Sequence, residues 1–94
     1  MIRFSAHVLF RMSVRSIPKK LVLHVVQNPK MVLYDVQEEN MVALGIGLYR
    51  GKRRWFAIPH TNINQELFVI TAYPISAQQI NNRIASGRWK DEEF

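Results

Sequence analysis

The sequence predicts an α+β domain, in which two N-terminal helices pack on a four-stranded antiparallel sheet and a third helix follows it. Three observations lead to this prediction. Apolar residues at helical spacing fill two segments before Asn28 and Pro29, alternation runs from Met41 to Tyr49, and a capping sequence begins at Ser76. The links between the expected strands are short, which favours antiparallel pairing because parallel strands need long crossovers. A chain of 94 residues accommodates one domain.

The first two elements are predicted to be helices. Ser5 is a favourable N-cap for a helix that runs to about Val14. Pro18 suits the first position of the second helix, and Ser16 is a candidate cap just before it. The pair at 28–29 ends this helix, because proline and the residue before it disfavour helical backbone.

Four strands are predicted next, each rich in β-branched or aromatic residues and bounded by polar turns: 31–36, 41–49, 54–58 and 67–73. In the second strand the large residues face one way, while Ala43, Gly45 and Gly47 face the other and allow another element to pack closely. The turn at 50–53 is basic, and a polar loop is expected at 60–66.

The chain is expected to close with a helix. Pro74 breaks the fourth strand, and Ser76 with Gln79 forms a capping box at the start of the helix. Gly87 is the expected stop, because glycine readily adopts the left-handed conformation that ends helices. Residues 88–94 mix charges with one tryptophan and are expected to form a loosely held tail.

The charge balance indicates an anionic partner. Thirteen lysines and arginines stand against seven acidic residues, a formal net charge of +6. This predicts RNA, DNA or an acidic protein as the partner, with charge that serves only solubility as the alternative. No apolar run reaches the roughly 18 residues that span a bilayer, and no signal-peptide pattern is evident. With no cysteine the chain excludes disulfides and thiolate chemistry, and a cytoplasmic location is expected.

A basic stripe is predicted on the first helix. His7, Arg11 and Arg15 are spaced four residues apart, so they share one face if the helix reaches that far. The rest of the helix is mainly apolar, so most of it is expected to be packed, with the stripe in a crevice. Such a site suits phosphate chemistry, because an imidazole can act as general base or acid and guanidinium groups can hold the phosphate. The alternative is local packing of His7 and pairing of the arginines with acidic residues.

A second basic group surrounds the predicted hairpin turn. Basic residues grip phosphates and aromatic rings stack on bases, so this segment is a candidate RNA contact: Arg50, Lys52, Arg53, Arg54 and Trp55. The alternative is a solvated turn anchored by its aromatic residues. On the fourth strand, Thr71 and Tyr73 fall on one face near the strand end. A tyrosine hydroxyl can donate to a phosphate oxygen or assist proton transfer.

Cofactor motifs are lacking in the sequence. The three histidines do not have metal-ligand spacing, and the acidic residues show no hard-cation cluster. Gly45 and Gly47 lie within a strand pattern instead of preceding a helix, so they do not form a phosphate loop. We therefore expect no metal and no cofactor.

Three blocks of residues carry a resemblance to a known family. They are Phe4-Ser5-x-His7 with Arg11, Arg15 and Ile17; Val69-Ile70-Thr71-Ala72-Tyr73-Pro74; and Arg83 with Gly87 and Arg88. Together with a helix that ends at Asn28 and Pro29, these blocks resemble the uncharacterised bacterial family 4258 of the domains of unknown function. That family is similar to the RelE/ParE/BrnT group of small toxins, and the resemblance spans most of the chain.

The resemblance implies a toxin-like scaffold, with helices on a curved antiparallel sheet. Many toxins of this group cut RNA without a metal, commonly on ribosome-bound messenger, while others inhibit DNA gyrase and cut nothing. RNA and an acidic antitoxin protein are then the expected partners. The family's polar pattern falls on His7, Arg11, Arg15, Thr71 and Tyr73.

The leading hypothesis is a metal-independent endoribonuclease of the toxin type, with His7, Arg11, Arg15 and Tyr73 as catalytic residues. Thr71, Arg83 and the basic hairpin are expected to bind the RNA. The alternative hypothesis is a non-catalytic module on the same scaffold, which binds nucleic acid or a protein such as gyrase.

Overall fold

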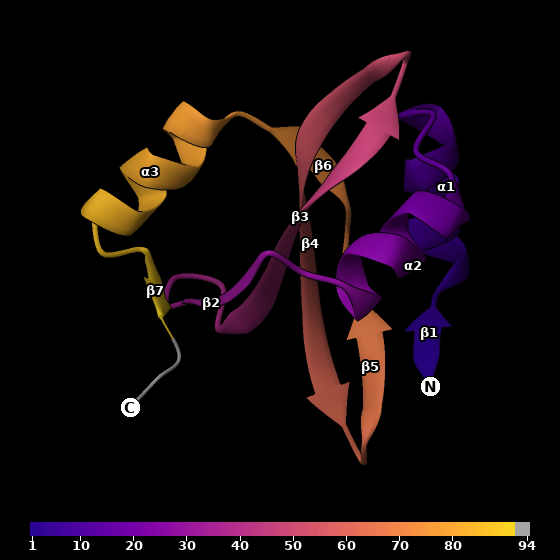
Figure 1. Ribbon diagram of the computed structural model, residues 1–94. Coiled ribbons are helices and arrows are strands. Elements are labelled where there is room, and N and C mark those ends of the chain that lie inside the picture. Colours follow the sequence, from indigo (N-terminus) through magenta and orange to yellow (C-terminus); the bar gives the residue numbers. More distant parts are fainter. Residues whose placement is uncertain (92–94) are drawn as a thin grey trace.

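The computed structural model of the protein describes residues 1–91, and Figure 1 shows its elements. In this part of the chain they are β1 Ile2–Phe4, α1 Ala6–Val14, α2 Lys19–Gln27, β2 Met31–Asp35, β3 Asn40–Tyr49, β4 Lys52–Ile63, β5 Glu66–Val69, β6 Tyr73–Ile75, α3 Ala77–Ala85 and β7 Trp89–Asp91. The predicted α+β class and the positions of three helices along the chain are confirmed. The prediction of four strands is wrong, because these residues form seven.

All seven strands belong to one sheet. Its order is β1-β5-β4-β3-β2-β7, and β6 pairs with residues 55–57 of β4. Neighbouring strands are antiparallel, as predicted, except β1 and β5, which run parallel. Helices α1 and α2 cover one face of the sheet and α3 lies on the other (Figure 1). The sheet thus separates two hydrophobic cores, one on each face.

Local signals set most helix ends as the sequence predicts. The Ser5 side chain accepts a hydrogen bond of 3.1 Å from a backbone N–H in the first turn and caps α1. At α3, Ser76 and Gln79 form the predicted capping box, and Gly87 follows the helix with φ of 82°. Pro18 differs from the expectation, because it is the N-cap of α2 and makes no side-chain cap bond. Each of these helices has nine residues, and none in residues 1–91 is long and apolar enough to cross a bilayer.

Close packing of α2 on β3 depends on two glycines, as the alternating pattern indicates. A Cβ atom on Gly45 would lie 3.0 Å from Val25 Cγ1, and one on Gly47 would lie 2.8 Å from Leu21 Cγ. Both helix residues are buried. Larger side chains on this side of β3 would therefore press against α2 and strain the packing.

The predicted polar loop at 60–66 is wrong. β4 continues to Ile63, and a two-residue turn at Asn64 and Gln65, both with positive φ, leads directly into β5. His60 lies within this extension and is only 4% exposed. The extension forms despite its polar residues because β5 pairs with each of residues 60–63.

Two further strands are not predicted by the sequence. β1 pairs with β5, and an ion pair of 2.9 Å between Arg3 and Glu66 joins the two strands. β6 contains Pro74, which the sequence predicts to break a strand, but here it pairs with Phe56 of β4. Proline is tolerated in such a position because β6 pairs with one neighbour only, as an edge strand does.

The expected loose tail also differs in its first part. Trp89 begins β7, pairs with Asp35 of β2 and is only 1% exposed. Its burial on the α3 side of the sheet ties this end of the chain to the second core. Residues 92–94 of the expected tail lie outside the described residues.

Candidate nucleic-acid interface

Arg15 and Thr71, two of the predicted site residues, contact each other. Arg15 Nη1 donates to Thr71 Oγ1 over 3.1 Å and to the backbone oxygen of Ala72 over 2.8 Å. The backbone oxygen of Arg15 accepts a hydrogen bond from the Tyr49 hydroxyl. Arg15 thus joins the end of α1 to β3 and to the segment after β5, which gives it a structural role.

His7 and Arg11 lie one turn apart on α1, and both are exposed. The expected crevice around them is wrong. α1 packs along one narrow side only, and the apolar residues Phe10 and Val14 are each 67% exposed. The physical reason is that the sheet offers α1 a single surface, and no other element of residues 1–91 covers the outer side of the helix.

Tyr73 belongs to the opposite side of the sheet from α1. It pairs with Ala57 of β4 and packs against the second core, which contains Ile80 of α3. The expected common face of Thr71 and Tyr73 is wrong, because residues 70–72 interrupt the strand. Thr71 contacts Arg15, whereas Tyr73 faces α3. The structure therefore does not bring Tyr73 together with the α1 residues.

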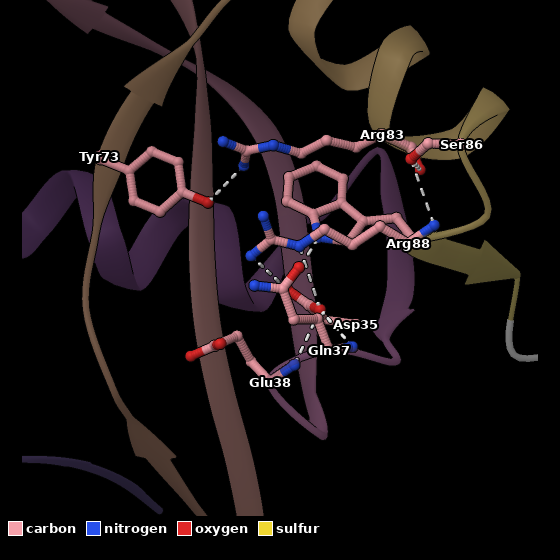
Figure 2. Close-up of polar contacts among 8 residues, drawn as sticks. Asp35, Gln37, Glu38, Tyr73, Arg83, Ser86 and Arg88 are labelled. Carbon is pink, nitrogen blue, oxygen red and sulfur yellow. Dashed lines mark hydrogen bonds and ion pairs between the residues drawn. The ribbon is translucent and has the colours of Figure 1, made fainter.

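Arg83 of α3 is held against two aromatic rings. Its Nη1 donates to the Tyr73 hydroxyl over 2.8 Å, as Figure 2 shows, and its guanidinium carbon lies 5.8 Å from the centre of that ring. The same carbon is 4.8 Å from the centre of the Trp89 ring. Within residues 1–91, Arg83 has no ion-pair partner. A guanidinium that is positioned but not neutralised keeps most of its donors for an anion.

Asp35 is a buried carboxylate beside this arrangement (Figure 2). Its Oδ1 accepts from Arg88 Nε over 3.3 Å and from the backbone N–H groups of Gln37 and Glu38. Its Oδ2 accepts from Arg88 Nη2 over 3.2 Å and from Trp89 Nε1 over 3.0 Å. Burial raises the pKa of Asp35, but these hydrogen bonds outweigh it and hold the pKa below its ordinary value. Asp35 is therefore ionised at neutral pH and fixes the indole of Trp89.

A basic-aromatic face extends from Arg83 along the sheet. On β4, Trp55 pairs with Ile75, and the residue two positions after Trp55 pairs with Tyr73, so the two aromatic residues are diagonal neighbours on one face. Arg53 precedes Trp55 by two residues and projects from the same face. We define the basic-aromatic face as Arg53, Trp55, Tyr73 and Arg83. Arg53 is exposed and the other three are half-buried, so a ligand can reach them.

The other basic residues of the predicted hairpin are exposed but do not share this face. Lys52 and Arg54 alternate with Arg53, so they project from the α1 and α2 side of the sheet. Arg50 stands at the turn with φ of 52°, and its guanidinium carbon lies 5.1 Å from the centre of the Tyr49 ring. The predicted RNA-binding group is thus divided between the two faces.

Asp35 and Trp89, which support the basic-aromatic face, are not among the residues that the sequence predicts for the site. They are 54 positions apart in the chain, and their hydrogen bond depends on the pairing of β2 with β7. The only sequence signal is that Asp35 ends an apolar segment, which leaves a carboxylate at the edge of the core.

The fold and this face define the class of the protein: an α+β domain with a basic and aromatic surface on one side of its sheet. Among residues 1–91, no three His, Asp or Glu side chains are grouped so that they could hold a metal ion. Comparison with protein families, with curated proteins and with solved structures found no match to this chain. The resemblance to the toxin group stays a prediction.

Proposed function

We propose that this protein binds single-stranded RNA through the basic-aromatic face. The observation that carries the proposal is the position of Arg83. Its Nη1 donates a hydrogen bond of 2.8 Å to the Tyr73 hydroxyl, and no carboxylate in residues 1–91 forms an ion pair with it. A side chain that is already ordered loses little conformational entropy when it binds a phosphate. Arg83 therefore suits a phosphate, and its aromatic neighbours suit bases.

The aromatic rings of the basic-aromatic face indicate that the ligand is single-stranded. Trp55 and Tyr73 are half-buried on a sheet surface, so they can stack on bases that are exposed but cannot enter a groove of a duplex. Stacking tolerates any base, because every base has a π-face. The net charge of +6 attracts the chain of phosphates over a longer range. RNA is preferred to DNA in the proposal because the resemblance implies a toxin that acts on RNA and is held by an acidic antitoxin.

Two matched variants test this interface. Arg83→Ala and Arg11→Ala each remove one positive charge, but Arg11 lies on α1, on the other side of the sheet. Binding of fluorescein-labelled single-stranded RNA is measured by anisotropy over a range of salt concentrations. Arg83→Ala is expected to weaken binding about five- to tenfold and to lower the salt slope by about one, while Arg11→Ala changes binding less.

The contrary result is equally informative. Unchanged RNA affinity in Arg83→Ala, together with a marked loss in Arg11→Ala, would place the interface on α1 and refute the proposal. Arg83→Lys separates charge from geometry, because lysine keeps the charge but not the planar guanidinium. Circular dichroism of each variant confirms that the fold is intact. Single-stranded DNA of the same sequence in the same assay tests the preference for RNA.

Metal-independent cleavage of RNA is the second candidate function. What favours it is that His7 and Arg11 are both exposed and one turn apart on α1, so one phosphate can reach an imidazole and a guanidinium. In this mechanism a 2′-hydroxyl attacks the neighbouring phosphate and loses its proton to His7. The bond from phosphorus to the 5′-oxygen of the next nucleotide breaks, and that oxygen leaves with a proton, so the products are a 2′,3′-cyclic phosphate and a 5′-hydroxyl. RNA incubated with the purified protein and EDTA is expected to be cut, and His7→Ala to abolish cutting. Intact RNA in the presence of the unaltered protein would refute cleavage and leave binding as the function.

A further inference from the structure

One half of β3 has no strand beside it on one side. β2 pairs with β3 only as far as Leu44, where the Lys30 backbone N–H also donates to the Leu44 oxygen over 2.8 Å. From Gly45 to Tyr49, β3 pairs with β4 alone among the residues described. This stretch is therefore an open strand edge, here called the β3 edge.

The backbone of the β3 edge presents unpaired groups. In an antiparallel ladder, alternate residues direct both their N–H and C=O toward the same neighbour. Leu44 directs its oxygen toward the β2 side, so Ile46 and Leu48 also face that side. The described chain gives neither residue a backbone partner there. Two N–H and two C=O groups are thus available in register for another strand.

A groove runs beside these groups. A cavity of about 380 Å³ lies between α2 and β3 and is lined by Pro18, Lys20, Leu21, His24, Gly47 and Leu48. Its walls are mainly apolar. The side chain of Leu48 is 69% exposed and projects from the other face of the sheet, because the neighbouring Gly47 faces α2. Lys20 and His24 are exposed on the helix side of the groove. An incoming strand would find hydrogen bonds on one side and an apolar contact on the other.

The surroundings of the β3 edge are positively charged throughout. The first acidic residue of the sequence is Asp35, and none lies between Glu39 and Glu66. Consequently α2, the β3 edge and the hairpin that follows it contain basic residues but no acidic ones. A second copy of this chain would place one basic edge against another, which costs energy through like-charge repulsion.

We propose that the β3 edge binds an extended acidic segment of a partner protein, which adds to the sheet as a further strand. Backbone hydrogen bonds to Ile46 and Leu48 provide the pairing, as in other cases of strand addition to a sheet edge. Apolar side chains of the segment pack against Leu48 on the face of the sheet opposite α2, and its carboxylates, which alternate with them, point toward α2 and meet Lys20 and His24. The β3 edge lies next to the basic-aromatic face, because Ile46 and Leu48 pair with Trp55 and Arg53 of β4. The two interactions use different groups: the β3 edge binds through backbone groups directed away from β4, whereas the basic-aromatic face binds through side chains.

Amide hydrogen exchange tests the proposal at the two residues concerned. The probe is a synthetic peptide in which Val alternates with Glu, added to the full-length protein labelled with ¹⁵N. Exchange of the Ile46 and Leu48 amides is expected to be fast in the free protein and to slow by about an order of magnitude or more with the peptide. A peptide that alternates Val with Lys is expected to have no effect. Slow exchange of both amides before any addition, dependent on protein concentration, would instead indicate self-association and refute the proposal.

Three variants locate the peptide. Leu48→Ser removes the apolar anchor and Lys20→Glu reverses the charge beside the groove, and each is expected to weaken peptide binding about tenfold. Ile63→Ser is the matched control, because Ile63 is also an aliphatic strand residue and is 52% exposed, but lies at the far end of β4. No binding of the Val-Glu peptide, equal binding of the Val-Lys peptide, or equal loss in Ile63→Ser would overturn the inference. The inference would also be overturned if single-stranded RNA protected the two amides to the extent expected for the Val-Glu peptide.

Discussion

The Arg83 guanidinium lies between two aromatic partners, with its Nη1 2.8 Å from the Tyr73 hydroxyl and its carbon 4.8 Å from the centre of the Trp89 ring. These residues come from β6, α3 and β7, so this contact ties together three elements that follow one another along the chain. The hydrogen bond fixes the direction of the guanidinium, and the nearby Trp89 ring attracts its positive charge. The result is an ordered cation on the α3 side of the sheet.

Tyr73→Phe tests whether this order matters for binding. The change keeps the ring but removes the acceptor of the Arg83 hydrogen bond, which contributes about 0.5–1.5 kcal/mol. RNA affinity is expected to fall about threefold to tenfold, with little change in the salt slope because no charge is lost. Anisotropy titration measures both quantities. An unchanged affinity would show that Arg83 does not need Tyr73 in order to bind RNA.

Trp55→Ala tests stacking on the basic-aromatic face. Loss of a base-aromatic stack is expected to cost about 1–3 kcal/mol of RNA binding free energy. Trp55→Phe keeps a π-face and is expected to retain most of the affinity, which makes it the matched control. Because Trp55 also packs against the second core, thermal unfolding of both variants must accompany the titrations. Equal affinities for Ala and Phe at this position would argue against stacking.

Asp35→Asn tests the buried carboxylate. Because the pKa of Asp35 is lowered in the fold, its ionised form contributes stability above the unfolded pKa, and this contribution is lost as pH falls through the folded pKa. The unaltered protein is expected to lose stability below about pH 4, and Asp35→Asn to show a smaller loss there. At neutral pH the variant is expected to be less stable by about 1–3 kcal/mol, because Arg88 and Trp89 lose a charged acceptor. Urea unfolding at several pH values measures both effects, and parallel pH profiles would contradict the assignment.

Gly45→Ala tests the close packing of α2 on β3. The added Cβ would lie 3.0 Å from Val25 Cγ1, and Val25 is fully buried and has a restricted χ1 in a helix. The variant is expected to be less stable by about 1–3 kcal/mol in urea unfolding. Combining Gly45→Ala with Val25→Ala provides the control, because the smaller helix residue relieves the contact. A double variant whose loss equals the sum of the two single losses would rule out this contact as the cause.

Much of the fold follows from local patterns in the sequence. The Ser76 and Gln79 capping box, the Ser5 cap and the left-handed Gly87 depend on residues within one or two helical turns. The alternation in β3 likewise predicts which side carries the small residues that meet α2. These features are predictable because the interacting groups are neighbours in the chain.

The candidate site could be predicted only in part. Trp55, Tyr73 and Arg83 carry chemistry that can be recognised in the sequence, but their common face depends on the pairing of β4 with β6. The stripe on α1 predicted the spacing of His7 and Arg11 correctly and their crevice wrongly. Spacing places two side chains on one helix face, but whether that face is covered depends on distant elements.

The sequence by itself determined the α+β class, the helices and their caps, the alternation of β3 and the positive charge of the chain. Only the tertiary structure decided that β1, β6 and β7 are strands, and that Thr71 contacts Arg15 while Tyr73 contacts Arg83. The physical reason is the origin of the stabilising interactions. A cap or an alternating pattern is stabilised by residues close in the chain, whereas a three-residue strand has no stability of its own. Such a strand forms only where a distant strand supplies its hydrogen bonds, and the side of the sheet that its side chains reach is decided by that pairing.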